Sequence, residues 1–197
     1  MTDDDDLVLD ASVWINLLAT GSAEEIFGAL PQRLVVVGRT TTELLRHPLD
    51  GGRRGNPIDP YLESGSLESV VLSGGALETF IELVGAAPPD DLGDGEAATL
   101  AHAHDVSSVA VIDERKARRI STERFPDLQV VSTVDLLRHD AVASALRGGL
   151  GDAVLSALQH GRMRVPPVHE EWVIEQIGRD NARQCPSLPR RLRMRTR

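Results

Sequence analysis

Acidic side chains directly follow two apolar segments of the sequence. Asp10 follows Leu7–Leu9 and Asp113 follows Val109–Ile112, and both segments have the composition of short buried strands. In open α/β sheets, functional sites lie at the carboxyl ends of the strands. If these two strands are neighbours, both carboxylates reach the same edge of the sheet.

Three further carboxylates are predicted near that edge. Glu43 lies a few residues beyond a third apolar run, Leu34–Val37, while Asp94 and Glu96 open an Ala-rich helix that leads toward Asp113. Two carboxylates about 4 Å apart repel by roughly 4 kcal/mol at an effective dielectric near 20. A cluster of four therefore takes up protons or binds cations. Oxygen ligands favour Mg²⁺ or Mn²⁺, and the corresponding chemistry is water attack on a phosphodiester.

The elements that must position these acids alternate between strands and helices. This alternation predicts an α/β fold with βαβ units, a central mostly parallel sheet and helices on both of its faces. The predicted strands are Leu7–Leu9, Leu34–Val37, Leu67–Leu72, Val109–Ile112 and Leu128–Val131. Everything beyond Val134 is expected to be helical.

Composition limits the function classes. The chain has 197 residues and a formal net charge of −9, which argues against a simple nucleic-acid binder but not against a protein that gathers carboxylates around metal ions. One cysteine, Cys185, excludes a disulfide framework and a Cys-rich zinc site. With no apolar run of about 18 to 20 residues and an acidic N-terminus, we expect no membrane partner and a cytoplasmic location.

Four segments in this order resemble a PIN-domain protein of the bacterial branch similar to type II toxin–antitoxin toxins. They are Leu7-Val8-Leu9-Asp10-Ala11-Ser12, Thr42-Glu43-Leu44, Leu92-Gly93-Asp94-Gly95-Glu96-Ala97-Ala98 and Val111-Ile112-Asp113-Glu114-Arg115-Lys116-Ala117-Arg118. The similarity runs from about Leu7 to Leu137. It implies a single PIN-like catalytic domain over residues 1–145, followed by a helical extension and Arg-rich tail over residues 146–197.

The resemblance implies a divalent-metal-dependent endoribonuclease that uses Mg²⁺ or Mn²⁺ to hydrolyse RNA phosphodiester bonds. Proteins of this type are often the toxin half of a toxin–antitoxin pair, so an antitoxin protein and a homodimer are the implied partners. The catalytic acids and metal ligands carried over by position are Asp10, Glu43, Glu96 and Asp113.

Some positions of the carried-over site remain open. Asp94 is a further candidate metal ligand, although Glu96 matches the third acid better because it stands immediately before the Ala-rich helix. Glu114 is the alternative to Asp113 as the fourth acid. Ser12, the hydroxyl neighbour of the first acid, and Arg118, in the family's Ala-Arg pair, are the candidate substrate-binding residues.

The same residues also have structural explanations. Acids at helix starts cap the helix and favour its macrodipole, and Glu43 also completes a capping box with Thr40. The cations from Arg115 to Arg119 either attract RNA phosphates or form a solvated helix face. The alternative function is therefore a catalytically silent PIN-like module that binds RNA or a protein.

Overall fold

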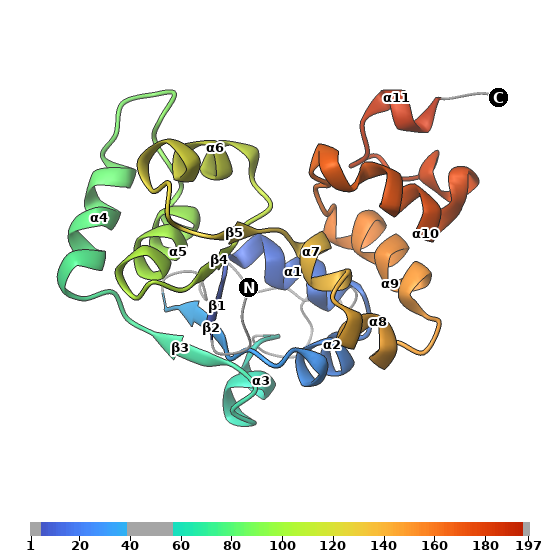
Figure 1. Ribbon diagram of the computed structural model, residues 1–197, viewed down its shortest axis with the longest axis horizontal. Coiled ribbons are helices and arrows are strands. Elements are labelled where there is room, and N and C mark those ends of the chain that lie inside the picture. The colour runs from blue at the N-terminus through green and yellow to red at the C-terminus, as the bar shows by residue number, and fades with distance from the viewer. Residues whose placement is uncertain (1–4, 39–56, 195–197) are drawn as a thin grey trace.

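A computed structural model describes residues 5–38 and 57–194 of the chain, which form an α/β fold (Figure 1). A five-stranded sheet lies at its centre and helices cover both faces. The strands are β1 (Leu7–Leu9), β2 (Leu34–Val37), β3 (Glu68–Val70), β4 (Val109–Val111) and β5 (Val130–Val131). The α-helices are α1 (Ala11–Ala19), α2 (Ala23–Ala29), α3 (Asp59–Glu63), α4 (Gly74–Val84), α5 (Asp94–Asp105), α6 (Arg115–Arg124), α7 (Thr133–Leu137), α8 (Asp140–Ala145), α9 (Leu150–Ser156), α10 (Glu170–Ala182) and α11 (Arg190–Arg193).

All strand pairs in the sheet are parallel, in the order β3-β2-β1-β4-β5. The predicted α/β class with a parallel sheet and flanking helices is therefore confirmed. β1 pairs with β4 in a register that places Leu9 opposite Val111, so the acids that follow these strands emerge at the same edge. The chain proceeds outward from β1 through β2 to β3 and then returns to β4 and β5, so the strand order reverses between β1 and β4.

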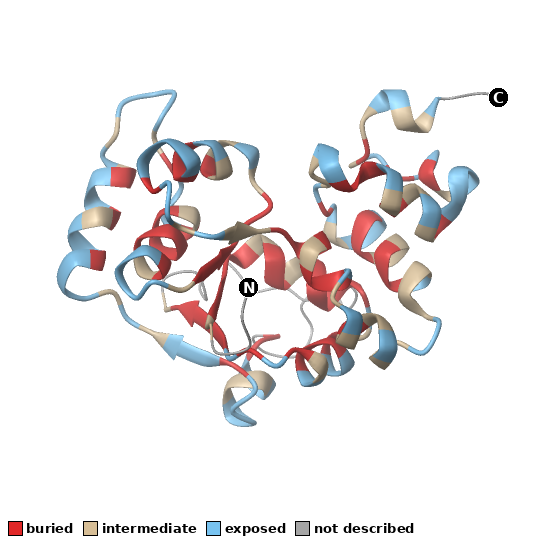
Figure 2. Ribbon diagram, viewed as in Figure 1, coloured by how far each residue is buried: buried red, intermediate tan, exposed pale blue. Residues whose placement is uncertain are grey.

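Side chains on successive strand positions enter two separate apolar layers, as the period of two in a strand requires (Figure 2). Leu7 and Leu9 of β1 pack with α1 and α2, whereas Val8 between them packs on the other face with α4, α5 and α6. Both faces are covered, which explains why the strands read as continuous apolar runs.

The chain beyond residue 145 packs into the first of these layers. Val154 of α9, Leu158 in the π-helix Ala157–Gly161 and Val173 of α10 are fully buried in the same cluster as Leu7 and Leu9. A short 3₁₀ helix, Pro167–His169, precedes α10. The C-terminal helices thus share a core with the sheet and form one side of its carboxyl edge (Figure 1).

The helices of the described residues include none that is both long and apolar enough to cross a bilayer.

Candidate functional site

Asp10 and Asp113 lie at the carboxyl ends of the neighbouring strands β1 and β4. The Asp10 amide donates to the Val111 carbonyl at 3.1 Å, which continues the pairing of the two strands past Leu9. Because the strand order reverses between β1 and β4, these ends border the crevice where open α/β sheets bind ligands. The two aspartates are therefore at the position that the fold favours for a site.

Asp10 is almost entirely buried, with 4% of its surface exposed. It caps α1, and its Oδ2 accepts hydrogen bonds from the Ser12 amide at 3.1 Å and from the Ser12 hydroxyl at 2.5 Å. Burial raises the pKa of Asp10, the Ser12 hydrogen bonds partly offset that rise, and the nearby charge of Glu114 adds to it. The predicted hydroxyl neighbour is thus in contact with the first acid.

Asp113 is also buried, and three hydrogen bonds orient its carboxylate. The Thr133 amide donates to Oδ1 at 2.8 Å, while the Thr133 hydroxyl at 2.5 Å and the Asn16 amide group at 2.7 Å donate to Oδ2. Desolvation nevertheless raises the pKa of Asp113 to about 6, because burial outweighs these bonds and Asp10 adds a like charge. The pair of aspartates is therefore a focus of poorly compensated negative charge.

Asn16, which holds Asp113, is a buried polar residue on the otherwise apolar inner face of α1. Its Nδ2 bonds Asp113, but its Oδ1 has no hydrogen-bond partner among the described residues. A Cβ at Gly161 would lie 2.5 Å from that oxygen, so the π-helix approaches α1 at a distance that glycine allows. A buried acceptor without a partner costs free energy unless a ligand or water satisfies it.

A small pocket of about 200 Å³ is lined by Asp113 and Asn16 together with two other acids, and we call it the acidic pocket. It is lined by Ser12, Ile15, Asn16, Glu96, Asp113, Glu114, Gly161, Arg162 and Arg164. The predicted third acid, Glu96, therefore comes from α5 to the same pocket as Asp113. Its carboxylate also turns back toward Gly93, the residue that caps α5.

The remaining predicted acids are placed differently. Asp94, at the start of α5, is exposed and does not line the acidic pocket, whereas Glu96 does. Glu43 lies outside the described residues. Within residues 5–38 and 57–194, no group of three or more His, Cys, Asp or Glu side chains is arranged to hold a metal ion.

Glu114, the alternative to Asp113, is engaged in structural bonds. Its Oε2 caps α6 by accepting from the Ala117 amide at 2.9 Å, and its Oε1 pairs with Arg164 at 2.8 Å. Burial raises the pKa of Glu114, but these hydrogen bonds and the Arg164 charge outweigh burial and leave it lowered. Of the two adjacent acids, Asp113 is thus the one whose charge the protein compensates less.

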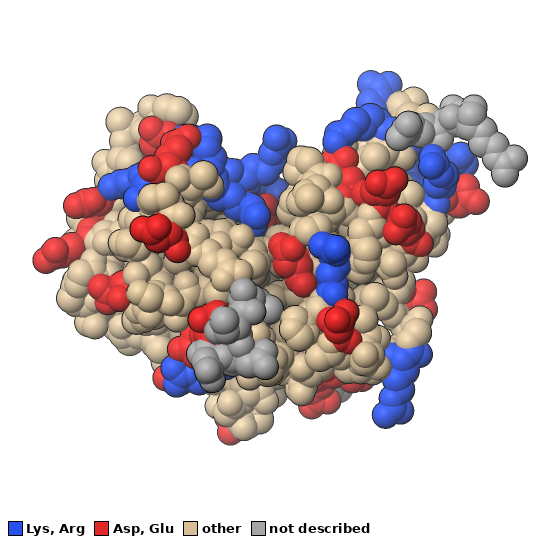
Figure 3. Space-filling view, viewed as in Figure 1, with Lys and Arg blue, Asp and Glu red and all other residues tan. Residues whose placement is uncertain are grey.

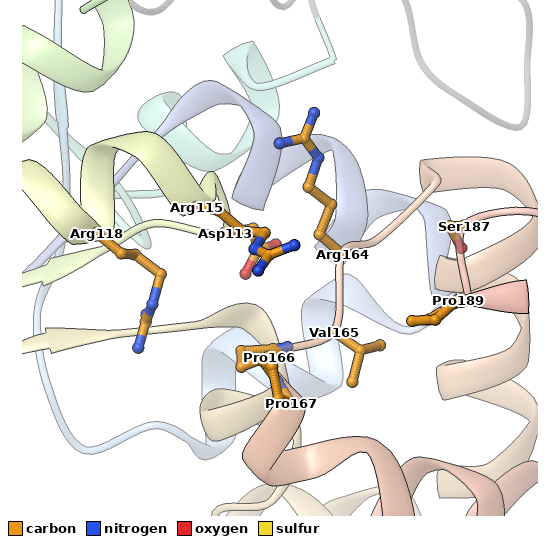
Figure 4. Close-up of a pocket in the computed structure, with 9 residues that line it drawn as sticks. All are labelled: Asp113, Arg115, Arg118, Arg164, Val165, Pro166, Pro167, Ser187 and Pro189. Atoms are coloured by element: carbon orange, nitrogen blue, oxygen red, sulfur yellow. The ribbon is translucent and has the colours of Figure 1, made fainter. Parts of the chain in front are cut away.

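A second cavity, of about 400 Å³, adjoins the acidic pocket and shares Asp113 and Arg164 with it (Figure 4). We call it the arginine pocket. It is lined by Asp113, Arg115, Arg118, Arg164, Val165, Pro166, Pro167, Ser187 and Pro189. Arg118, a predicted substrate-binding residue, therefore lies beside Asp113, and its Nη1 donates to the Ile112 carbonyl at 3.2 Å.

Sequence reasoning missed Asn16 and Arg164. Asn16 had one usable signal, because it is an amide among the apolar residues Val13, Leu17 and Leu18 of α1. Arg164 had none, since it reaches the site from 50 residues beyond Glu114.

Comparison of the chain with protein-family models, with curated proteins and with solved structures finds no match.

Proposed function

We propose that this protein is a PIN-like, divalent-metal-dependent endoribonuclease that hydrolyses RNA phosphodiester bonds. The observation that carries the proposal is the pair Asp10 and Asp113, two buried carboxylates with raised pKa values at the carboxyl ends of adjacent parallel strands. Perturbed carboxylates in a crevice are typical of functional sites, because their charge is costly unless it serves a ligand.

The donor set fits a hard cation. Asp113 and Glu96 offer carboxylate oxygens in the acidic pocket, and Asp10 lies at the end of the adjacent strand. Asn16 adds a buried amide oxygen that lacks a partner in the described part of the chain. Mg²⁺ and Mn²⁺ prefer such ligands, and Mg²⁺ often uses one or two carboxylates together with water and substrate phosphates. Asp10 and Asp113 would hold the ion, with Glu96 and Asn16 beside them. When bound, such an ion supplies an activated water and stabilises the leaving oxygen.

The chain's own residues position these ligands. Ser12 fixes the Asp10 carboxylate through its amide and hydroxyl, while Thr133 and Asn16 fix Asp113 from two different elements. These hydrogen bonds fix the orientation of both carboxylates before a ligand binds. Such preorganisation reduces the reorganisation needed at the moment of reaction.

The proposal is tested by incubating an end-labelled single-stranded RNA with the protein in Mg²⁺ or Mn²⁺. We expect cleavage by the wild type and a loss of at least about 100-fold, the scale of removing one preorganised catalytic group, for Asp10→Asn and for Asp113→Asn. Asp127→Asn replaces an exposed aspartate that lines neither the acidic pocket nor the arginine pocket, so it is the matched control and should cleave normally. Full activity in both active-site variants would overturn the assignment.

The alternative is a catalytically silent PIN-like module that binds RNA or a protein. It is compatible with the described residues, among which no group of three acids is arranged for a metal. Calorimetric titration with Mn²⁺ separates the two, because a silent module shows no binding at millimolar metal. An antitoxin partner and a homodimer remain predictions from the resemblance, and a cytoplasmic location remains a prediction from the composition.

A further inference from the structure

The cations of α6 divide into two groups according to whether they form ion pairs. Lys116 pairs with Asp91 at 3.5 Å, Arg119 with Asp90 and Glu123 at 2.7 Å each, and Arg124 with Glu82 at 2.9 Å. Asp90 and Asp91 follow α4, Glu82 belongs to α4, and Glu123 belongs to α6 itself. These three cations are therefore charge-balanced, as expected of a solvated helix surface.

Arg115 and Arg118 also belong to α6 and are three residues apart, so they are neighbours on the helix surface. Neither forms an ion pair with the described residues, and the described hydrogen bond of Arg118 goes to a neutral carbonyl. Both line the arginine pocket, and Asp113 lines it too (Figure 4). Because neither arginine forms an ion pair with that carboxylate, both are suited to an anionic ligand.

The C-terminal part of the chain supplies the opposite wall. Arg164 stands across the cavity from Arg118, and its Nη1 contacts Glu114 while its side chain remains 58% exposed (Figure 4). Pro166, Pro167 and Pro189 make the rest of that wall apolar. In the space-filling view, basic side chains over α6 border the hollow between α6 and the C-terminal helices (Figure 3).

The lining contains no Phe, Tyr, Trp or His side chain, so a base that enters has no aromatic ring among the described residues to stack on. Proteins that read single-stranded bases generally use such rings. Guanidinium groups instead match the oxygens of a phosphate, often through two parallel hydrogen bonds. The chemistry of the cavity therefore favours the sugar–phosphate backbone over the bases.

We propose that the arginine pocket binds the phosphodiester backbone of a single-stranded RNA beside Asp113, with Arg115, Arg118 and Arg164 as the phosphate-binding residues. The choice of RNA rests on the proposed function. The new element is that the C-terminal extension builds half of the substrate site and contributes Arg164. Because the protein would touch phosphates and not bases, binding has little base preference and a strong dependence on salt.

The test measures binding without chemistry. Fluorescence anisotropy of a labelled, unstructured single-stranded RNA is recorded in EDTA over a series of salt concentrations. For Arg115→Ala, Arg118→Ala and Arg164→Ala we expect affinity to fall about fivefold to tenfold each, equally for RNAs of different sequence. The slope of log K against log salt should become shallower by about 0.7 for each phosphate that the variant no longer neutralises.

Arg119→Ala is the matched control, because Arg119 is on the same helix but is paired with Asp90 and Glu123 and does not line the arginine pocket. It should bind RNA like the wild type. Arg118→Lys keeps the charge and should recover part of the affinity, which distinguishes removal of a phosphate-binding cation from a folding defect. Wild-type binding by the three pocket variants, or equal weakening by Arg119→Ala, would overturn the proposal.

Competition identifies the source of the phosphate. Inorganic phosphate and a mononucleotide should displace the labelled RNA only at much higher concentration than an unlabelled RNA strand. Equal potency of the mononucleotide would mean that the ligand is a small phosphate compound and would overturn the strand proposal. The nuclease assay is independent of this binding test. If the wild type cuts no RNA but the pocket variants lose RNA binding, the nuclease proposal is refuted and the pocket proposal is supported. If the wild type cuts RNA and the pocket variants bind it normally, only the pocket proposal is refuted.

Discussion

Replacing Asp113 by Asn should stabilise the metal-free protein at neutral pH. Burial raises the pKa of Asp113 from 3.8 to about 6, so the folded state binds its proton more tightly than the unfolded state does. Stability therefore falls as pH rises through this interval. Each pKa unit corresponds to about 1.4 kcal/mol, so the ionised carboxylate costs about 3 kcal/mol once the pH is well above 6.

The asparagine can retain most of the local hydrogen bonds. Its carbonyl oxygen can accept from the Thr133 amide, as the carboxylate does at 2.8 Å. The amide group of the new asparagine can donate to Asn16 Oδ1 if the Asn16 amide rotates by about 180°. Asn16 Oδ1, which has no partner among the described residues, then accepts a hydrogen bond. We therefore expect Asp113→Asn to raise the free energy of unfolding by about 1 to 3 kcal/mol at pH 8 and by much less at pH 4, where the carboxyl group is protonated in the folded state and partly protonated in the unfolded state.

The measurement is urea unfolding in EDTA at several pH values between 4 and 8, followed by circular dichroism. Asp127→Asn, which replaces an exposed aspartate, should match the wild type throughout. A variant that is less stable than the wild type at pH 8, or whose stability difference does not change with pH, would refute the reasoning. Either result would mean that the Asp113 carboxylate is not an uncompensated buried charge.

Three other perturbations test the remaining parts of the structure. Mn²⁺ at ten times its dissociation constant should stabilise the wild type by about 1.4 kcal/mol, seen as a higher melting temperature, and should leave Asp10→Asn unshifted; equal shifts would count against the site. Leu158→Ala, which empties a fully buried position in the π-helix, should cost about 2 to 5 kcal/mol in one cooperative urea transition, whereas two transitions would separate the extension from the sheet. The pKa of Asp135 is lowered because hydrogen bonds from Ser132 and the 2.7 Å contact with His169 outweigh its burial. The ionised Asp135 carboxylate therefore stabilises the fold above pH 3.8, and this stabilisation disappears below that pH. Asp135→Asn should be less stable than the wild type by about 1 kcal/mol at pH 7, and the difference should shrink as the pH falls. A difference that stays constant with pH would argue against a contribution from the ionised carboxylate.

The sheet and its helices were predictable because local sequence signals agree with the tertiary structure. Leu34–Val37 is a β-branched apolar run between polar residues, and both faces of β2 are buried, so composition and burial agree. The order of the strands was not predictable from these runs. It depends on pairings such as Leu9 with Val111, which are about 100 residues apart and leave no local trace.

The candidate site divides in the same way. Asp10 and Asp113 were predictable because each directly follows a buried strand, and a strand's end fixes where the next side chain emerges. Arg164 was not, since its place depends on how the π-helix Ala157–Gly161 packs against α1. Asn16 was hidden by its apolar neighbours, and its partner Asp113 lies 97 residues away.

Net charge is a poor guide to what this protein binds, because the charges are distributed unevenly around the carboxyl edge of the sheet. The chain carries −9 overall, yet Arg115 and Arg118 lack acidic partners among the described residues, while Lys116, Arg119 and Arg124 of the same helix are neutralised. Asp113 lines both cavities, so a phosphate in the arginine pocket would lie next to a carboxylate that repels it. A divalent cation in the acidic pocket removes that repulsion, and bound phosphate in turn adds oxygen ligands for the cation. Metal and RNA should therefore each raise the affinity for the other, which is the coupling expected where two adjacent sites bind opposite charges and both include Asp113.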